Sequence, residues 1–107
     1  MKRRTPTDEQ HAAAALQALS RAFAALGKPD EVRAFLQDLC TPAELEAMAD
    51  RWRVVPLLLK GVPYREIHDL TDVSVTTIGR VARTMENGEG GYAAALRRQS
   101  PRAVASH

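Results

Sequence analysis

Apolar residues recur along this chain every three or four positions, which is the period of an amphipathic α-helix. The first such stretch contains Ala12, Leu16, Leu19, Phe23 and Leu26. Thr7 and Gln10 fit a capping box in front of it, and Gly27 ends it. The spacing resembles that of a coiled coil, so we expect this helix to pack against the rest of the fold or against a partner chain.

Two further helices are predicted before residue 61. Pro29 begins a short helix whose apolar face consists of Val32, Phe35, Leu36 and Leu39. The segment Thr41-Pro42-Ala43-Glu44 fits a second capping box, with proline at the first helical position. It predicts a helix that continues across Pro56 to about Lys60 and stops at Gly61.

Residues 63–86 predict two short helices joined by a tight turn. The first runs from Tyr64 to about Thr71, with Ile67 and Leu70 on its inner face. Ser74 is a natural N-cap for the second, which runs from 75 to about 86. Two helices in this arrangement are typical of a helix-turn-helix.

The second helix of this pair carries polar residues on one face. Its inner face is expected to bury Ile78, Val81 or Ala82, and Met85, whereas Gly79 is placed on the outer face. A recognition helix needs small, hydrogen-bonding or cationic residues where it enters the major groove, and Gly79 is interpreted as permitting close approach to DNA. The expected DNA-contacting residues are Arg65, Val75, Thr76, Thr77, Arg80 and Arg83. An ordinary helical hairpin with a polar outer face would give a similar pattern.

The composition favours a single all-α domain. The chain has 107 residues, 45% of them hydrophobic, and no segment shows the alternation of a β-strand. We assign residues 1–6 to a basic arm, 7–98 to the helical domain, with a last short helix from Tyr92 to Arg98, and 99–107 to a polar tail. A chain of this length has a thin core, which favours a dimer.

Charge is distributed unevenly, although the net charge is only +2. Residues 30–50 carry a net charge of −5, and residues 51–83 carry +3. A basic half beside an acidic half is typical of a surface that faces a polyanion. Two solvated helix faces would explain the charges equally well.

Several classes of protein are excluded. The chain contains no apolar run long enough to cross a membrane and no signal-peptide core, so we expect a cytoplasmic protein. Cys40 has no cysteine to pair with, and the three histidines form no metal-ligand cluster. No nucleophile, base or paired carboxylates stand in a catalytic pattern, so we expect neither a metal site nor an enzyme.

The span from about Phe35 to Leu96 resembles the Trp-repressor family, and within it the YerC/YecD-type branch. The matching motifs are the segments 39–44, 50–53, 57–61, 64–67, 73–81 and 90–92. The resemblance implies a helical bundle in which two chains intertwine as a homodimer. It also implies sequence-specific binding of double-stranded DNA by two symmetry-related helix-turn-helix units, and thus a transcriptional regulator, in particular a repressor.

The resemblance also implies a candidate effector pocket. In the family's namesake, tryptophan lies between two arginines, and Arg51 and Arg80 match their positions. Thr41 and Thr77 match residues beside that pocket. Val81 stands where the namesake has a glycine, and its side chain would occupy part of the indole site. We therefore expect no cofactor, and L-tryptophan is disfavoured as a ligand.

A function from another class also fits the residues. In this alternative the chain is a helical protein-interaction module without sequence-specific DNA binding, and its basic face docks an acidic protein. Salt-dependent binding to DNA distinguishes this alternative from a DNA-binding regulator only weakly, because any basic surface produces it. Sequence preference in a selection from random duplexes distinguishes them.

Overall fold

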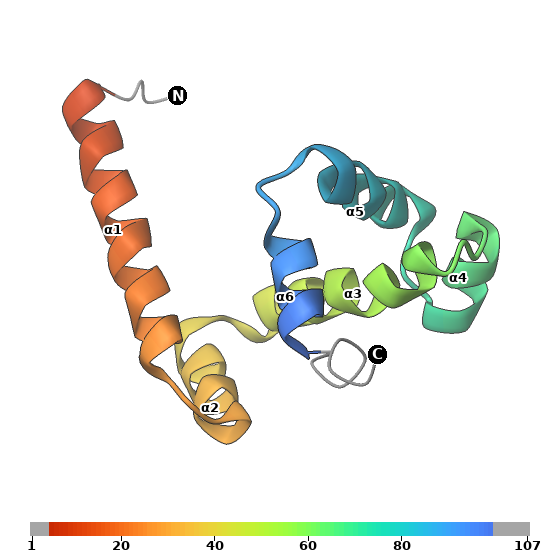
Figure 1. Cartoon of the computed structure of the whole chain (residues 1–107), viewed down its shortest axis with the longest axis horizontal. Coiled ribbons are helices and arrows are strands. Elements are labelled where there is room, and N and C mark those ends of the chain that lie inside the picture. Colours follow the sequence, from red (N-terminus) through yellow and green to blue (C-terminus); the bar gives the residue numbers. More distant parts are fainter. Residues whose placement is uncertain (1–4, 100–107) are drawn as a thin grey trace. The chain divides into compact units, whose positions relative to one another are not determined.

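A computed structural model describes residues 5–99 of the chain. Within this range it contains helices and no strands, which confirms the predicted all-α class. The helices are α1 (Pro6–Ala25), α2 (Pro29–Leu39), α3 (Pro42–Leu59), α4 (Tyr64–Thr71), α5 (Val75–Asn87) and α6 (Gly91–Gln99), as labelled in Figure 1. The chain divides into two compact units, residues 1–42 and 43–107.

The start of α1 differs from the prediction. Thr5, not Thr7, is its N-cap: the Thr5 hydroxyl oxygen accepts the Asp8 backbone N–H at 3.0 Å, and the Asp8 carboxylate accepts the Thr5 N–H at 3.2 Å. Pro6, which the sequence placed in the basic arm, is the first helical residue, a position that suits proline because it has no N–H to donate. Residues 1–4 of the expected arm and 100–107 of the expected tail lie outside the described residues.

The first unit has apolar residues but no buried ones. The rings of Phe23 in α1 and Phe35 in α2 meet edge to face, with their centroids 5.1 Å apart. No residue of α1 or α2 is buried, and Leu16 in the middle of the predicted stripe is 64% exposed. Leu16 is thus the exposed member of the predicted stripe, and Ala12, Leu19, Phe23 and Leu26 are half-buried.

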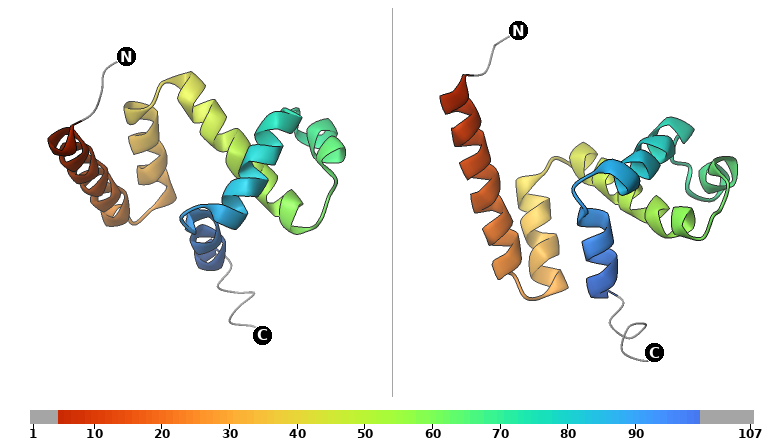
Figure 2. Two further views of the ribbon diagram at one scale, coloured as in Figure 1. Left: turned by 90° about the horizontal axis from the view of Figure 1, so that it is seen from above. Right: turned by 45° about the horizontal axis from the view of Figure 1, so that its top comes forward.

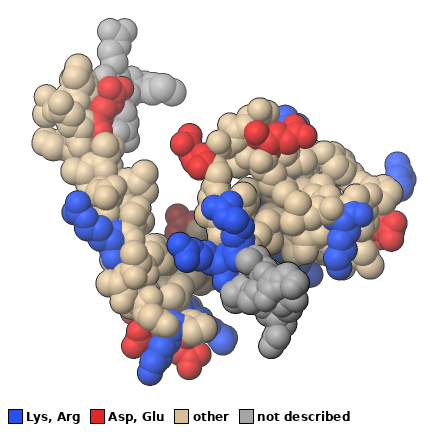
Figure 3. All heavy atoms as spheres, in the orientation of Figure 1, with Lys and Arg blue, Asp and Glu red and all other residues tan. Residues whose placement is uncertain are grey.

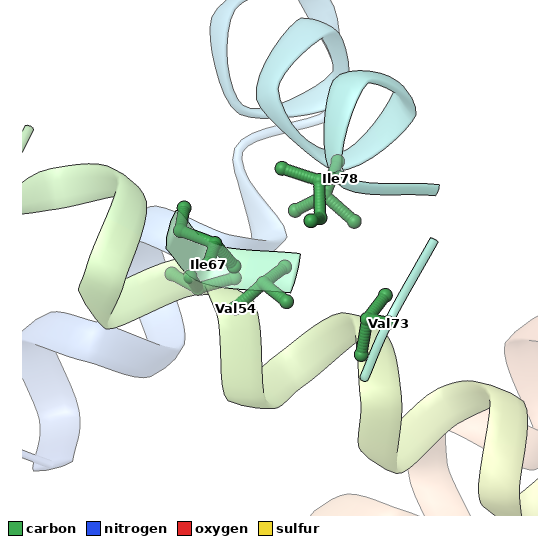
Figure 4. Close-up of a cluster of buried hydrophobic side chains, with 6 residues drawn as sticks. Val54, Ile67, Val73 and Ile78 are labelled. Carbon is green, nitrogen blue, oxygen red and sulfur yellow. The ribbon is translucent and has the colours of Figure 1, made fainter. Parts of the chain in front are cut away.

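The second unit contains the hydrophobic core. Val54 and Val55 of α3, Ile67 of α4, and Ile78 and Val81 of α5 are fully buried, and Val73 of the connecting turn is 4% exposed. Figure 4 shows four of these side chains pointing toward one another from three helices and the turn. Burial of Ile67, Ile78 and Val81 confirms the predicted inner faces.

Leu70 contradicts the inner face predicted for α4. It is 61% exposed, although it lies three residues after the buried Ile67. With only eight residues, α4 presents a narrow face to the small core, and Ile67 occupies it.

Helix α3 continues across Pro56 and ends where the sequence predicts. Gly61 adopts a φ of 78°, a conformation that glycine adopts without strain. The Gly61 N–H donates to the Leu58 carbonyl, and the Val62 N–H donates to the Leu57 carbonyl at 3.1 Å. This pair of bonds is a Schellman motif, and it turns the chain toward α4.

Candidate nucleic-acid interface

Helices α4 and α5 form the predicted helix-turn-helix. They lie side by side at an angle in both views of Figure 2, joined by residues 72–74. Asp72 ends α4 with a φ of 65°, and its N–H donates to the His68 carbonyl at 2.7 Å. A left-handed residue at this point reverses the chain within three residues, so the order and bounds of the two helices match the prediction.

Ser74 caps α5 as predicted. Its hydroxyl oxygen accepts the Thr77 backbone N–H at 3.1 Å, and its O–H donates to the Thr77 hydroxyl oxygen at 3.0 Å. The Ser74 carbonyl accepts the Ile78 N–H, which begins the helical ladder. The cap fixes the first turn of α5, the part of a recognition helix that enters the major groove.

Most of the predicted DNA-contacting residues are exposed on the helix-turn-helix. Val75 is 49% exposed at the start of α5, whereas Thr77, whose hydroxyl takes part in the cap, is half-buried. The exposed polar residues are Thr76, Arg80 and Arg83 of α5 and Arg65 of α4. Positions 76, 80 and 83 share one face of α5, because three- and four-residue steps return to the same side of a helix.

Gly79 does not lie on the exposed face, and its predicted role in approaching DNA is wrong. It is buried, and a side chain at this position would meet the Arg83 Nη1 atom at 3.5 Å and the Tyr64 ring at 3.7 Å. The glycine therefore lies where α5 meets the first turn of α4. Distances of this size are ordinary van der Waals contacts, so even an alanine would fit there.

A hollow in the surface adds one residue to the predicted interface. It has a volume of about 380 Å³ and is lined by Arg80, Arg83, Thr84, Asn87 and Gly88. Asn87 was not predicted, although its spacing of seven residues from Arg80 and four from Arg83 places all three on one side of the helix. Two guanidinium groups and an amide around one hollow can donate hydrogen bonds to an anionic oxygen.

Charged side chains are separated on the visible face of the second unit. In Figure 3 its Lys and Arg side chains form distinct groups within a largely uncharged surface.

Comparison with known proteins gives a consistent result. The family model described as "Trp repressor protein" matches residues 14–100. The chain belongs to the Trp repressor family. It is 35% identical over 83 residues to the YerC protein of Bacillus subtilis (strain 168), a protein named as uncharacterized, and the match covers 78% of this chain and 80% of YerC.

A solved structure supports the same assignment. A chain from Staphylococcus aureus, whose crystal structure carries a provisional Trp-repressor assignment, superposes with a TM-score of 0.74. The two chains are 32% identical, and the match covers 80% of this chain and 86% of the other. The Trp-repressor fold and the YerC-type resemblance expected from the sequence are thus confirmed.

The candidate effector residues of the Trp repressor family are divided between the two units. Thr41 belongs to the first unit, and Arg51, Arg80 and Val81 belong to the second. Arg51 is half-buried and Arg80 is exposed, whereas Val81 is fully buried among the core residues. The valine side chain is therefore an integral part of the core.

Residues 5–99 contain neither a candidate metal site nor a candidate membrane-spanning helix. No group of three or more histidine, cysteine or acidic side chains in this range could hold a metal ion. None of the helices in the same range is long and apolar enough to cross a membrane.

Proposed function

We propose that this chain is a sequence-specific DNA-binding transcriptional regulator, a repressor, and not an enzyme. It acts on double-stranded DNA in the cytoplasm. The observation that carries the proposal is the exposed face of α5, where Val75 and Thr76 follow the Ser74 cap and Arg80 and Arg83 lie one and two turns further on. A valine methyl can contact a thymine methyl group, a threonine can contact bases or phosphates, and arginine can bind guanine with two hydrogen bonds. Membership of the Trp repressor family supports the same function.

The proposed active form is an intertwined homodimer. The exposed Leu16 of α1 and Leu39 of α2 support it, because a second copy of the chain would remove them from water. A two-fold axis would then relate two α5 helices. Such a dimer binds an inverted repeat whose half-sites lie about 34–36 Å apart, one turn of DNA.

The individual residues have different roles in this proposal. Arg80 and Val75 read bases, whereas Arg83, Asn87 and Arg65 hold phosphates and fix the register of the protein on the duplex. Thr77 contributes mainly through the cap, since its hydroxyl accepts from Ser74. We propose that L-tryptophan is not required, because Val81 stands where the family's namesake has a glycine and its side chain would occupy part of the indole site.

Selection of binding sites from random duplexes tests this function. We expect an enriched inverted repeat. On that repeat, Arg80→Ala should cost about 1–3 kcal/mol and relax preference at one position in each half-site. The matched control is Arg97→Ala, which removes the same charge from an exposed position on α6 and should preserve the preference.

Two results would contradict the proposal. If the selection enriches no sequence, the basic face does not recognise specific DNA sequences. The helical protein-interaction module is then the better description of the chain. If Arg80→Ala weakens binding to all duplexes equally and reduces the salt dependence, Arg80 contacts only phosphate.

A further inference from the structure

The residue that precedes the cap of α5 is held by side chains of α4. The Val73 side chain is 4% exposed in the core, so it anchors the turn by packing. The Val73 N–H donates to the Thr71 hydroxyl at 3.1 Å, and the Val73 carbonyl lies 2.8 Å from Nδ1 of His68. Both backbone polar groups of this residue are thus bonded to side chains of the preceding helix.

In the contact between His68 and the Val73 carbonyl, the histidine is the hydrogen-bond donor. A carbonyl oxygen can only accept, so Nδ1 of His68 carries the proton and donates it. The ring is half-buried, and the bond spans five residues across the turn. Thr71 is fixed in turn, because its hydroxyl donates to the Ile67 carbonyl at 2.7 Å.

These bonds leave little conformational freedom in the turn that joins α4 and α5. The Asp72 N–H bonds to the His68 carbonyl, Val73 is held as described, and Ser74 immediately begins the α5 cap. A recognition helix reads bases only when its first turn lies within a few tenths of an ångström of the required position, because hydrogen bonds weaken steeply with distance and angle. Contacts to phosphates by long, flexible arginines tolerate larger shifts.

We propose that His68 is a positioning residue for sequence recognition, which it serves by fixing the Val73 carbonyl and thereby the first turn of α5. The inference rests on the proposed DNA-binding function. His68 acts through the turn, and Thr71 assists it by holding the N–H of the same residue. Loss of the His68 bond therefore reduces discrimination between sequences more than it reduces affinity for DNA in general.

The first measurement needs no substitution. In nitrogen-15 NMR spectra of the full chain above neutral pH, the neutral His68 ring should carry its proton on Nδ1. An exposed histidine favours the proton on Nε2, and His11 in α1, which is exposed, provides the internal reference. A proton on Nε2 of His68 would overturn the proposal, because the bond to Val73 could not then exist.

The second measurement compares the selected duplex with a random duplex at constant salt. We expect His68→Ala to reduce the ratio of the two affinities about three- to tenfold, the size expected for one hydrogen bond, and to change binding to the random duplex little. His68→Asn should restore much of the ratio, because its amide N–H occupies nearly the place of Nδ1. Leu70→Ala, an exposed position on the same helix, is the matched control and should leave the ratio unchanged.

The outcomes separate the two proposals. If the unsubstituted protein prefers its selected duplex and His68→Ala keeps that preference, only the positioning role is wrong. Equal losses on both duplexes would also overturn it, since they indicate a purely structural residue. If the unsubstituted protein shows no preference, the proposed function fails and the positioning role with it. If His68→Ala is too unstable to measure, Thr71→Val removes the companion bond at constant shape and should reduce the ratio in the same direction.

Discussion

The two units of this chain contain similar helices but bury them very differently. The first unit carries a regular apolar stripe on α1, an edge-to-face contact between Phe23 and Phe35, and no buried residue. The second unit buries residues from α3, α4, α5 and the turn in one cluster. Regular helical spacing alone therefore does not produce a core, which here requires three helices packed together.

The difference has a physical cause. Stability requires apolar area to be removed from water, and two helices joined at one end cover little of each other. The second unit folds α4 and α5 back through tight turns at Gly61 and Asp72, which brings three apolar faces together. From this contrast we expect the second unit to determine the stability of the chain and the first unit to determine its assembly.

The largest effect is expected in the core of the second unit. Ile78→Ala removes a fully buried side chain and should lower the free energy of unfolding by about 2–5 kcal/mol in urea denaturation at fixed protein concentration. Val75→Ala on the same helix is half exposed and should cost much less. Equal costs for the two substitutions would show that the cluster is not the stabilising core.

A smaller effect is expected from the stripe of the first unit, and it should appear in assembly. Leu16→Asp places a charge at the exposed residue of the stripe and should forfeit about 1.5–3 kcal/mol of burial per chain, shifting a dimer toward the 11.7 kDa monomer in sedimentation equilibrium. The control is Ala14→Asp, which lies on the opposite side of α1 and should leave the dimer intact. A stable monomer of the unsubstituted protein would refute the intertwined dimer.

Gly79 within α5 and Gly88 at its C-cap should respond to alanine with opposite signs. At Gly88 an added methyl group would lie 2.5 Å from the Thr84 carbonyl oxygen, so Gly88→Ala should lower the free energy of unfolding by about 1–3 kcal/mol. At Gly79 the nearest atoms are 3.5 Å away, so Gly79→Ala should raise it by about 0.5–1 kcal/mol through helix propensity.

DNA binding provides a second measurement on the same glycines. Gly79→Ala should leave it unchanged, because the glycine is covered by Tyr64 and Arg83. Thermal melting and DNA-binding isotherms of Gly79→Ala and Gly88→Ala test these predictions. If Gly79→Ala lost DNA affinity without losing stability, the glycine would face the DNA after all.

The smallest effect is expected from L-tryptophan. At millimolar concentration it should neither raise the melting temperature nor strengthen DNA binding, whereas a ligand at 100 times its dissociation constant would stabilise the fold by about 2.7 kcal/mol. Val81→Gly, the substitution that would reopen an indole site, also removes a fully buried core side chain and should lower stability. A clear melting shift with tryptophan in the unsubstituted protein would show that Val81 does not block the site.

Local sequence signals determined the helices and the turn. Pro42, Gly61 and Ser74 mark helix ends through backbone chemistry that depends only on neighbouring residues, and the observed bounds follow them closely. The error at α1 was also local, because Thr5-Pro6 and Thr7 offer competing caps and proline favours the earlier one. The exposed arginines of α5 were predictable from their spacing for the same reason.

Tertiary structure alone decided which positions are covered and what holds the turn. Gly79 lies under Tyr64, and Leu70 remains exposed, because the angle between α4 and α5 selects which part of each face is used. The bond from His68 to Val73 depends on a turn that brings residues five apart into contact, and no periodic pattern encodes it. Periodicity specifies the side of a helix that is apolar, whereas burial and long-reach hydrogen bonds depend on where the neighbouring helix lies in space.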